Sequence, residues 1–246
     1  MPPKPALAIS KPARAITVPV YNEAENLPAL LRDWQAVFAA TGAPYRVILI
    51  DDGSTDDSLR LLQTMAAGDP TLEVHTQPNA GHGPAILNGY RRAVDPVAGA
   101  DWVFQIDSDH QLDTTAFTLL WANRMEYDLL IAQRLDKNAT PGRQRISAIS
   151  RGIVRLLFGN AVSDVNSPYR LMRAERLRQA LAKVPTDSFA PNILLTAWFV
   201  RKKNRIFTTT TQNRKEGSLR QSKVSRHIFR GAWQSALQTL LFRIRL

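Results

Sequence analysis

Two aspartates separated by one serine, Asp107 and Asp109, follow the mostly apolar stretch 102–106. Residues two apart in an extended chain point to the same side, so both carboxylates can share one ligand. Their charges repel, and a cation between them removes that repulsion. Carboxylates and the amide oxygen of Gln111 are hard ligands that suit Mg²⁺ or Mn²⁺, with water and substrate phosphates completing the shell. The residues indicate a divalent metal site, although a solvated turn after a strand uses the same residue types.

Two further polar clusters offer groups that could hold a nucleotide. In the stretch 19–23, Tyr21 presents a flat ring to a base and Glu23 presents an acceptor. The stretch 51–54 adds carboxylates that could accept hydrogen bonds from a ribose or a base. Structural interpretations stay open for both clusters. The first is also a helix start with Asn22 as its cap, and the second is also a turn.

A glycine-containing loop at 79–83 matches neither the Walker nor the Rossmann phosphate-binding pattern. We expect Gly81 and Gly83 to let this loop pass close to a ligand or to the sheet. His82, which lies between them, would then be a neighbour of the ligand.

The elements that must position these clusters alternate between β-branched runs and helical apolar spacing. The pattern predicts strands at 14–20, 45–52, 72–77 and 101–107, and helices at 23–40, 56–67 and 84–94. Such alternation is typical of an α/β fold with a mostly parallel sheet and helices on both faces. Ligands in these folds bind at the carboxyl ends of the strands, so the polar clusters should gather at one sheet edge.

The composition is that of a globular protein, and 246 residues fit one large domain. There is no cysteine, which excludes disulfides and thiolate metal sites. Residues 1–133 hold 9 Lys and Arg against 16 Asp and Glu, whereas residues 134–246 hold 23 against 5. The basic second half implies an anionic partner: a nucleic acid, an anionic membrane surface or a phosphorylated substrate.

The two ends of the chain differ from the region between them. Residues 1–13 are rich in proline and predict a disordered lead-in before a single domain at 14–220. Residues 221–246 predict a basic amphipathic helix with Phe229 and Trp233 on its apolar face. Such a helix suits a membrane interface, and it also suits packing on the core or a dimer contact. No apolar run reaches the roughly 20 residues needed to cross a bilayer, and we expect a cytoplasmic protein.

Five motifs, in this order, resemble those of the family 2 glycosyltransferases of GT-A fold, and most of all the branch of dolichol-phosphate mannose synthase and polyprenyl-phosphate glycosyltransferases. They are VPVYNEAENL, VILIDDGSTDDS, NAGHGPAILNGY, WVFQIDSDHQLD and SDVNSPYRLM. The resemblance covers about residues 14–220. It implies a GT-A domain that moves a sugar from a UDP- or GDP-linked donor to an acceptor and uses Mg²⁺ or Mn²⁺.

The resemblance also implies roles for matching residues. The nucleoside would be held by Pro19, Tyr21, Glu23, Ile50 and Asp52. The metal and the diphosphate would be held by Asp107, Ser108, Asp109 and Gln111.

Arginines of the basic half acquire a role through the same resemblance. The acceptor phosphate would be held by Arg134, Arg145, Ser150 and Arg151, and the donor diphosphate would be covered by Arg214 and Arg220. A guanidinium suits this task because its planar fork binds phosphate oxygens in pairs. Each of these arginines could instead be a solvated surface charge.

One departure from the family bears on the acceptor. Where many relatives with sugar acceptors carry a Glu-Asp pair as catalytic base, this chain offers only Asp187 and Asn192. A hydroxyl acceptor needs a base, but a phosphate with a pKa near ~6 is already ionised. We therefore expect inverting transfer to a polyprenyl phosphate, dolichyl or undecaprenyl, at the inner face of the membrane. For a hydroxyl acceptor, Asp164 would be the base, although an internal ion pair between Asp164 and Arg170 is the alternative.

Two other functions remain as alternatives. The enzyme could glycosylate a saccharide or another hydroxyl acceptor, or the basic half could belong to a nucleic-acid-binding protein. Against the latter, the sequence has no helix-turn-helix, RRM or zinc pattern, and its aromatic residues are not interleaved with basic ones. We expect no nucleic-acid partner.

Overall fold

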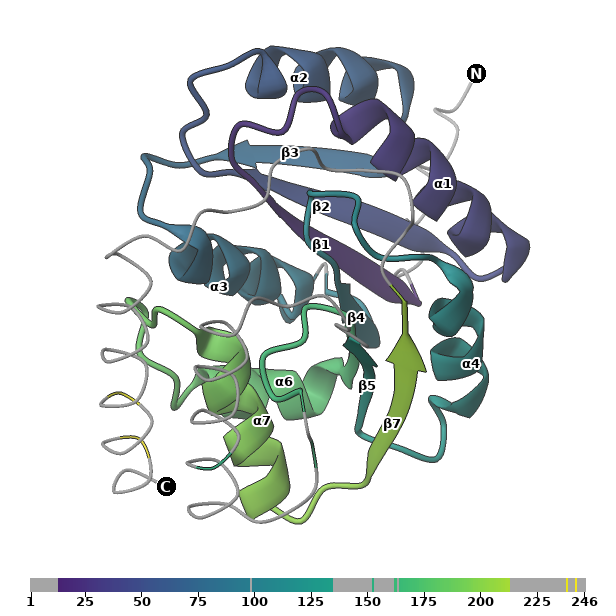
Figure 1. Cartoon of the computed structure of the whole chain (residues 1–246), viewed down its shortest axis with the longest axis vertical. Helices are drawn as coiled ribbons and strands as arrows, with labels where there is room; N and C mark the ends of the chain where they lie inside the picture. The colour runs from purple at the N-terminus through teal and green to yellow at the C-terminus, as the bar shows by residue number, and fades with distance from the viewer. Residues whose placement is uncertain are drawn as a thin grey trace, which may run out of the picture.

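Seven strands form one sheet in the order β3-β2-β1-β4-β6-β5-β7 (Figure 1). The computed structural model describes residues 13–97, 99–134, 152, 162, 164–212, 238 and 242. The strands are β1 Arg14–Val20, β2 Tyr45–Asp51, β3 Leu72–Thr76, β4 Trp102–Gln105, β5 Leu129–Arg134, β6 Arg170–Arg173 and β7 Ile206–Thr211. In this described sheet, β6 runs antiparallel to its neighbours β4 and β5, and the other pairs are parallel. The carboxyl ends of β1, β2, β4 and β5 therefore meet at one edge, as the alternating pattern predicts.

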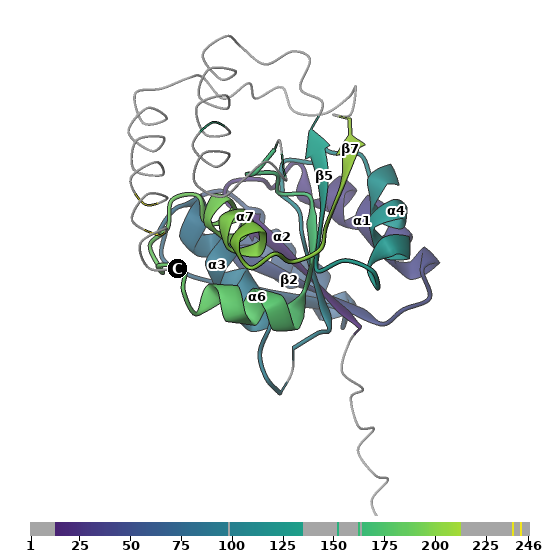
Figure 2. The ribbon, with the colours of Figure 1, turned by 90° about the horizontal axis from the view of Figure 1, so that it is seen from below.

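Helices cover both faces of the sheet. They are α1 Leu27–Ala40, α2 Ser58–Gly68, α3 His82–Ala93, α4 Thr115–Asn123, α6 Ala174–Leu181 and α7 Pro191–Arg201. Buried side chains of α3, α6 and α7 pack on one face of the strands, and those of α1, α2 and α4 pack on the other. Figure 2 shows α3, α6 and α7 on one side of the strands, with α1 and α4 on the opposite side. The α/β sandwich expected from the sequence is confirmed.

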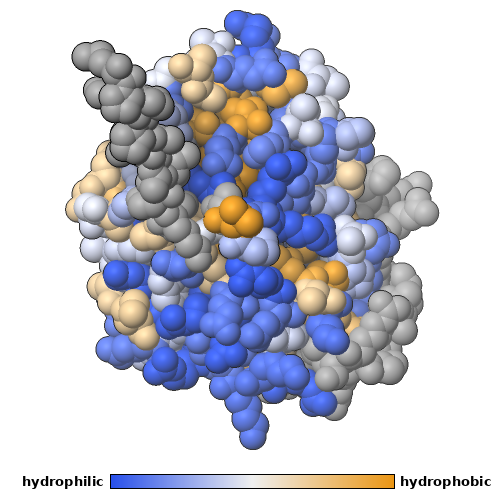
Figure 3. All heavy atoms as spheres, turned by 180° about the vertical axis from the view of Figure 1, so that it is seen from behind, coloured by the Kyte–Doolittle hydropathy of each residue, from blue (hydrophilic) through white to orange (hydrophobic). Residues whose placement is uncertain are grey.

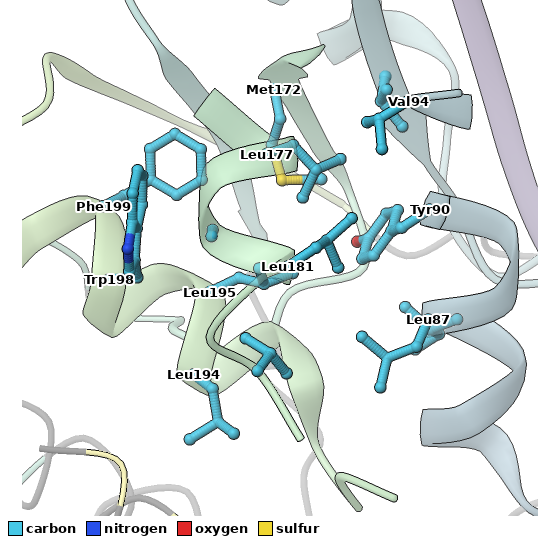
Figure 4. Close-up of a cluster of buried hydrophobic side chains, with 14 of the residues drawn as sticks. Leu87, Tyr90, Val94, Met172, Leu177, Leu181, Leu194, Leu195, Trp198 and Phe199 are labelled. Atoms are coloured by element: carbon cyan, nitrogen blue, oxygen red, sulfur yellow. The ribbon is translucent and has the colours of Figure 1, made fainter. Parts of the chain in front are cut away.

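The first core lies between the sheet and the helices α3, α6 and α7. Strand residues alternate between the faces, so Ala15 and Val103 enter this core while Ile16 and Phe104 enter the other. Figure 4 shows Tyr90 of α3 reaching toward Leu181 and the side chains of α7. The Tyr90 side chain is completely buried.

The second core is an aromatic cluster under α1 and α4. Its rings, including Trp34, Phe38, Phe104 and Phe117, lie with centroids 4.8 to 6.2 Å apart. Arg14 of β1 is completely buried among them. Aromatic pairs in tilted and edge-to-face arrangements add to the stabilisation that burial alone provides.

The first helix begins later than its sequence predicts. The pattern predicted a helix from residue 23 with Asn22 as cap, but α1 begins at Leu27. Asn22 has a φ of 55°, which lies in the left-handed region. Its side-chain oxygen accepts the backbone N–H of Thr55 at 2.8 Å instead of capping α1. The expected cap is therefore wrong, because a contact with a distant loop fixes this turn.

Parts of the terminal predictions lie outside the described residues. Of the segment 221–246, only Gln238 and Phe242 are described, and both are helical. Phe242 is 1% exposed and belongs to the first core, while the Gln238 side-chain oxygen accepts the backbone N–H of Phe189 at 3.1 Å. At these two positions the segment contacts the folded domain. In the part of the chain that is described, we find no helix with the length and apolarity that crossing a bilayer requires.

The face opposite that of Figure 1 is mostly hydrophilic, with hydrophobic side chains in scattered groups (Figure 3). Among the described large hydrophobic residues, Val97 and Met125 are the most exposed, at 90% and 63%. Singly exposed apolar side chains of this kind are common on proteins.

Candidate active site

A cavity of about 420 Å³ opens at the carboxyl ends of β1, β2 and β4. Seven residues with an expected role line it: Pro19, Tyr21, Glu23, Asp52, Asp107, Ser108 and Asp109. Tyr21 is 46% exposed, which leaves its ring accessible to a ligand. The topology thus brings three clusters that are far apart in sequence around one cavity.

Asp109 lies in a strongly acidic environment. Burial, together with the charges of Asp107 and Glu23, raises the pKa of Asp109 to about 6, against the lowering effects of the Gln111 N–H and of Arg134. The Gln111 backbone N–H donates to the Asp109 Oδ1 at 3.1 Å. The repulsion among these carboxylates is the electrostatic situation that a bound cation relieves.

Asp107 contacts two neighbouring side chains. The Gln105 amide donates to the Asp107 Oδ1 at 3.3 Å, and the His82 Nε2 lies 3.5 Å from the same oxygen. His82 is the first residue of α3 and also lines the cavity. The expectation that His82 would be near the ligand site therefore agrees with its position.

The carboxylates of Asp107 and Asp109 fit a hard divalent ion whose other ligands come from water and the substrate. Among the described residues, no group of three or more His, Asp or Glu side chains is arranged to hold a metal. Asp107 and Asp109 would therefore supply two carboxylate ligands, and the remaining positions would be open to water and phosphate oxygens. Mg²⁺ is commonly bound in this way, through one or two carboxylates and the phosphates of a substrate.

Arg134 brings a positive charge to this acidic edge. It ends β5, and its Nε lies 2.9 Å from the Asp164 Oδ2 while its Nη2 lies 3.3 Å from the Oδ1. Burial opposes the charged guanidinium, but the ion pair with Asp164 and the charges of Asp107 and Asp109 outweigh burial and raise the pKa of Arg134. Arg134 is therefore held in its charged form, near enough to both strand-end aspartates for their charges to interact, although it is not among the residues that line the cavity.

The alternative ion pair between Asp164 and Arg170 is wrong. Asp164 pairs with Arg134, and Arg170 instead donates to the backbone oxygens of Val165, Ser167 and Asn192. Arg170 is completely buried, so it requires several acceptors, and the carbonyls satisfy this requirement. Asp164 would have to leave Arg134 before it could act as a base.

Asp52 holds the glycine-containing loop in place. Its Oδ1 accepts the Ala80 N–H at 2.9 Å and its Oδ2 accepts the Gly81 N–H at 2.9 Å. Gly81 has a φ of 95°, which few other residues adopt. A Cβ on Gly83 would lie 2.0 Å from the Ser188 carbonyl oxygen, so the start of α3 passes directly against that backbone. Gly83 thus allows a close approach, but to the segment before α7 and not to the sheet, whereas a Cβ on Gly81 would meet nothing within 4 Å and Gly81 is needed for its φ.

Other residues with an expected role lie elsewhere. Ile50 is completely buried in the first core and does not line the cavity, so its part would be limited to the placement of β2. Gln111 reaches Asp109 through its backbone N–H. Outside the described residues lie Arg145, Ser150, Arg151, Arg214 and Arg220.

Sequence reasoning missed a buried polar network behind Asp107. It joins Tyr90 of α3, Gln105 of β4 and Asn192 of α7. A signal was present in the sequence, since Gln105 interrupts an apolar strand and a buried amide needs partners. Asn192 is 2% exposed and bonded inside this network, whereas Asp187 is exposed.

Comparisons with known proteins agree with this geometry. The model of the family described as Glycosyl transferase family 2 matches residues 15–189. An undecaprenyl-phosphate 4-deoxy-4-formamido-L-arabinose transferase of Klebsiella pneumoniae is 29% identical over 191 residues, which cover 76% of this chain and 56% of the relative. The protein of that name from Pectobacterium carotovorum is 30% identical over 192 residues, with the same coverage. The chain thus spans about half the length of these curated relatives.

Solved structures show the same fold. Glucosyl-3-phosphoglycerate synthase from Mycobacterium tuberculosis, in complex with Mn²⁺, UDP and phosphoglyceric acid, matches with a TM-score of 0.64 and 17% identity, covering 94% of this chain and 78% of that one. TarS residues 1–349 from S. aureus, in complex with UDP-GlcNAc, matches with a TM-score of 0.59 and 18% identity, covering 93% and 66%.

Proposed function

The chain belongs to glycosyl transferase family 2, and we propose that it moves a sugar from a UDP- or GDP-linked donor to a polyprenyl phosphate, with inversion at the anomeric carbon. The observation that carries the proposal is a cavity lined by Tyr21, Asp107 and Asp109 at the sheet edge where β5 ends with Arg134, whose charge interacts with both aspartates. Anionic and cationic groups for two phosphorylated substrates thus share one edge of the sheet. The glycosyltransferase domain would extend over residues 14–220.

The donor would lie in the cavity. Tyr21 offers its accessible ring to the base, and Glu23 offers an acceptor to the nucleoside. Asp52 would contribute to the nucleoside site while its two oxygens hold the loop at Ala80 and Gly81. Asp107 and Asp109 would hold Mg²⁺ or Mn²⁺. When bound, the ion would supply positive charge that stabilises the departing nucleoside diphosphate. Solved neighbours of this fold contain Mn²⁺ and UDP, which supports this assignment.

The acceptor is proposed to be a phosphate because the candidate bases for a hydroxyl are poorly placed. Among the described candidates, Asp164 is engaged with Arg134, Asn192 is a buried amide and Asp187 is exposed. A phosphate monoester needs no base, since it is largely ionised at pH 7. Its oxygen would attack the anomeric carbon in line while the bond to the nucleoside diphosphate breaks. The names of the curated relatives, which specify undecaprenyl phosphate, support this acceptor class.

Basic residues would grip the two phosphate groups. The acceptor phosphate is proposed to bind Arg134, Arg145, Ser150 and Arg151, and the donor diphosphate is proposed to bind Arg214 and Arg220. The strongly basic second half would also favour attachment to an anionic membrane surface. We accordingly propose a peripheral location at the inner, cytoplasmic face of the membrane.

A direct assay tests the function. The purified chain is incubated with Mg²⁺ or Mn²⁺, a short polyprenyl phosphate and a panel of UDP- and GDP-sugars, and the products are identified by mass spectrometry. We expect one polyprenyl phospho-sugar as product, and we expect EDTA to prevent its formation. Transfer to added saccharides with no lipid product would overturn the acceptor assignment, and full turnover in EDTA would overturn the metal assignment.

A further inference from the structure

Gln105 is a buried polar residue in the middle of the sheet. It ends β4, its side chain is completely buried, and it stands two residues before Asp107. Side chains two apart on a strand face the same side of the sheet, so the amide lies next to the carboxylate. A buried amide stays in place only when its donors and acceptors are satisfied.

The partners of Gln105 come from three elements. Its Nε2 donates to the Asp107 Oδ1 at 3.3 Å. Its Oε1 accepts the Asn192 Nδ2 at 2.8 Å and also the Tyr90 hydroxyl. The Tyr90 hydroxyl lies 2.9 Å from the Asn192 Oδ1 as well. Figure 4 shows Tyr90 directed from α3 into the space toward α6 and α7.

The chemistry of these groups allows one arrangement. A carboxylate only accepts hydrogen bonds, so Gln105 must turn its NH₂ toward Asp107 and its oxygen toward Tyr90 and Asn192. Asn192 then has to donate to that oxygen, and the Tyr90 proton is shared between the two amide oxygens. Burial raises the pKa of Tyr90 far above its usual value, which keeps the hydroxyl protonated as a donor. The Asp107 carboxylate thus sets the orientation of the Gln105 amide, and the Gln105 amide sets that of the Asn192 amide.

Asn192 is itself firmly held. Its backbone oxygen accepts the Arg170 Nη1 at 3.1 Å and the Thr196 hydroxyl at 2.8 Å. It is the second residue of α7, directly after the segment whose Ser188 carbonyl touches Gly83. The network therefore connects the start of α7 with the carboxylate at the end of β4.

We infer that Gln105 is a positioning residue for Asp107: held by Tyr90 and Asn192, it fixes the rotamer in which the carboxylate can hold a divalent ion. This rests on the proposed function, since it presumes that Asp107 binds a metal. Residues that orient metal ligands typically change metal affinity about 10- to 100-fold when they are removed. Gln105 would act in this way although it makes no contact with substrate.

The test compares two matched variants by their binding of Mn²⁺ alone. Gln105→Met keeps the size of the side chain but removes the bond to Asp107. Gln35→Met removes another glutamine-to-aspartate bond, the one from Nε2 of Gln35 to Asp69, on α1 and away from the cavity. Free Mn²⁺ is followed by electron paramagnetic resonance, and folding is followed by thermal unfolding. We expect Mn²⁺ to bind Gln105→Met about 10-fold more weakly than wild type, and to bind Gln35→Met as it binds wild type.

The outcomes separate the inference from the proposed function. Binding of Mn²⁺ to Gln105→Met with wild-type affinity would overturn the positioning role while the proposed function stood. Absence of Mn²⁺ binding by the wild type would overturn the metal assignment, and the inference with it. Should Gln105→Met fail to fold, Asn192→Ala carries the test, because Gln105 then keeps only Tyr90 on its oxygen. We expect this variant to bind Mn²⁺ a few-fold more weakly, and an unchanged affinity would again overturn the positioning role.

Discussion

The two ends of β1 hold charges in opposite ways. At its start, Arg14 is completely buried, with its Nη2 donating to the Phe38 carbonyl at 2.6 Å and its guanidinium 4.5 Å from the Trp121 ring centroid. At its other end, beside the cavity, carboxylates repel one another: Glu23 follows β1, and Asp107 and Asp109 follow the neighbouring strand β4. The first charge is enclosed by aromatic rings and one carbonyl of the folded chain, whereas the second group is completed only by a bound cation. This difference separates a structural charge from a functional one.

The largest expected effect comes from removing a charge at the cavity. Asp109→Asn should lower glycosyl transfer by roughly 100- to 1,000-fold, because a weaker metal ligand leaves the departing diphosphate without charge compensation. Initial rates with the lipid-phosphate assay measure this. A variant with wild-type turnover would show that Asp109 is no part of the catalytic site. The carboxylates at this end of β1 would then have no assigned function to contrast with the structural role of Arg14.

Removal of the structural charge should act on stability alone. Arg14→Ala should lower the free energy of unfolding by roughly 2–4 kcal/mol, since it leaves a cavity among aromatic rings and removes several cation–π contacts. The transfer rate per folded molecule should not change. Chemical denaturation and initial rates measure the two quantities, and a fall in the rate of the folded protein would contradict a purely structural role.

A matched control for this variant is Arg14→Met. Burial lowers the pKa of Arg14 to about 10, and its Nε and Nη1 have no hydrogen-bond partner among the described residues. An apolar side chain of similar length keeps the packing and removes these unsatisfied donors. We therefore expect Arg14→Met to lose less stability than Arg14→Ala; an equal loss would show that the charge, and not the packing, carries the effect.

Much of the cavity was predictable from local patterns, but its fine positioning was not. The alternating strands and helices place Asp52 and Asp107 at strand ends, and topology then brings them to one edge. The Arg134–Asp164 pair and the turn at Asn22 depend on partners 30 or more residues away, which no local spacing reveals. Arg14 likewise appears in the sequence as an ordinary strand flank, because the rings around it come from α1, β2 and α4.

The carboxylates near the end of β1 should also have a smaller effect, on the stability of the metal-free protein. The pKa of Asp109 is raised from 3.8 to about 6, so the folded state binds more protons than the unfolded state between these values. Stability should fall as pH rises through this window, and above it the full destabilisation of roughly 1–3 kcal/mol is present. Asp109→Asn should therefore unfold at a higher temperature than wild type at pH 7 in EDTA, with the difference vanishing near pH 4.

An exposed aspartate provides the reference for this measurement and the smallest expected effect. The Arg60 Nε lies 3.1 Å from the Asp57 Oδ1, but the side chains of Asp57 and Arg60 are 70% and 73% exposed. Ion pairs in such positions are screened by solvent and contribute little. Asp57→Asn should leave the unfolding temperature unchanged across the same pH range. If it shifted that temperature as Asp109→Asn does, the shift would reflect net charge and not the crowding of carboxylates at the cavity. An Asp109-specific shift would instead mean that the chain gives up stability at one end of β1 to keep a site ready for a cation, as enzymes do where function requires strain.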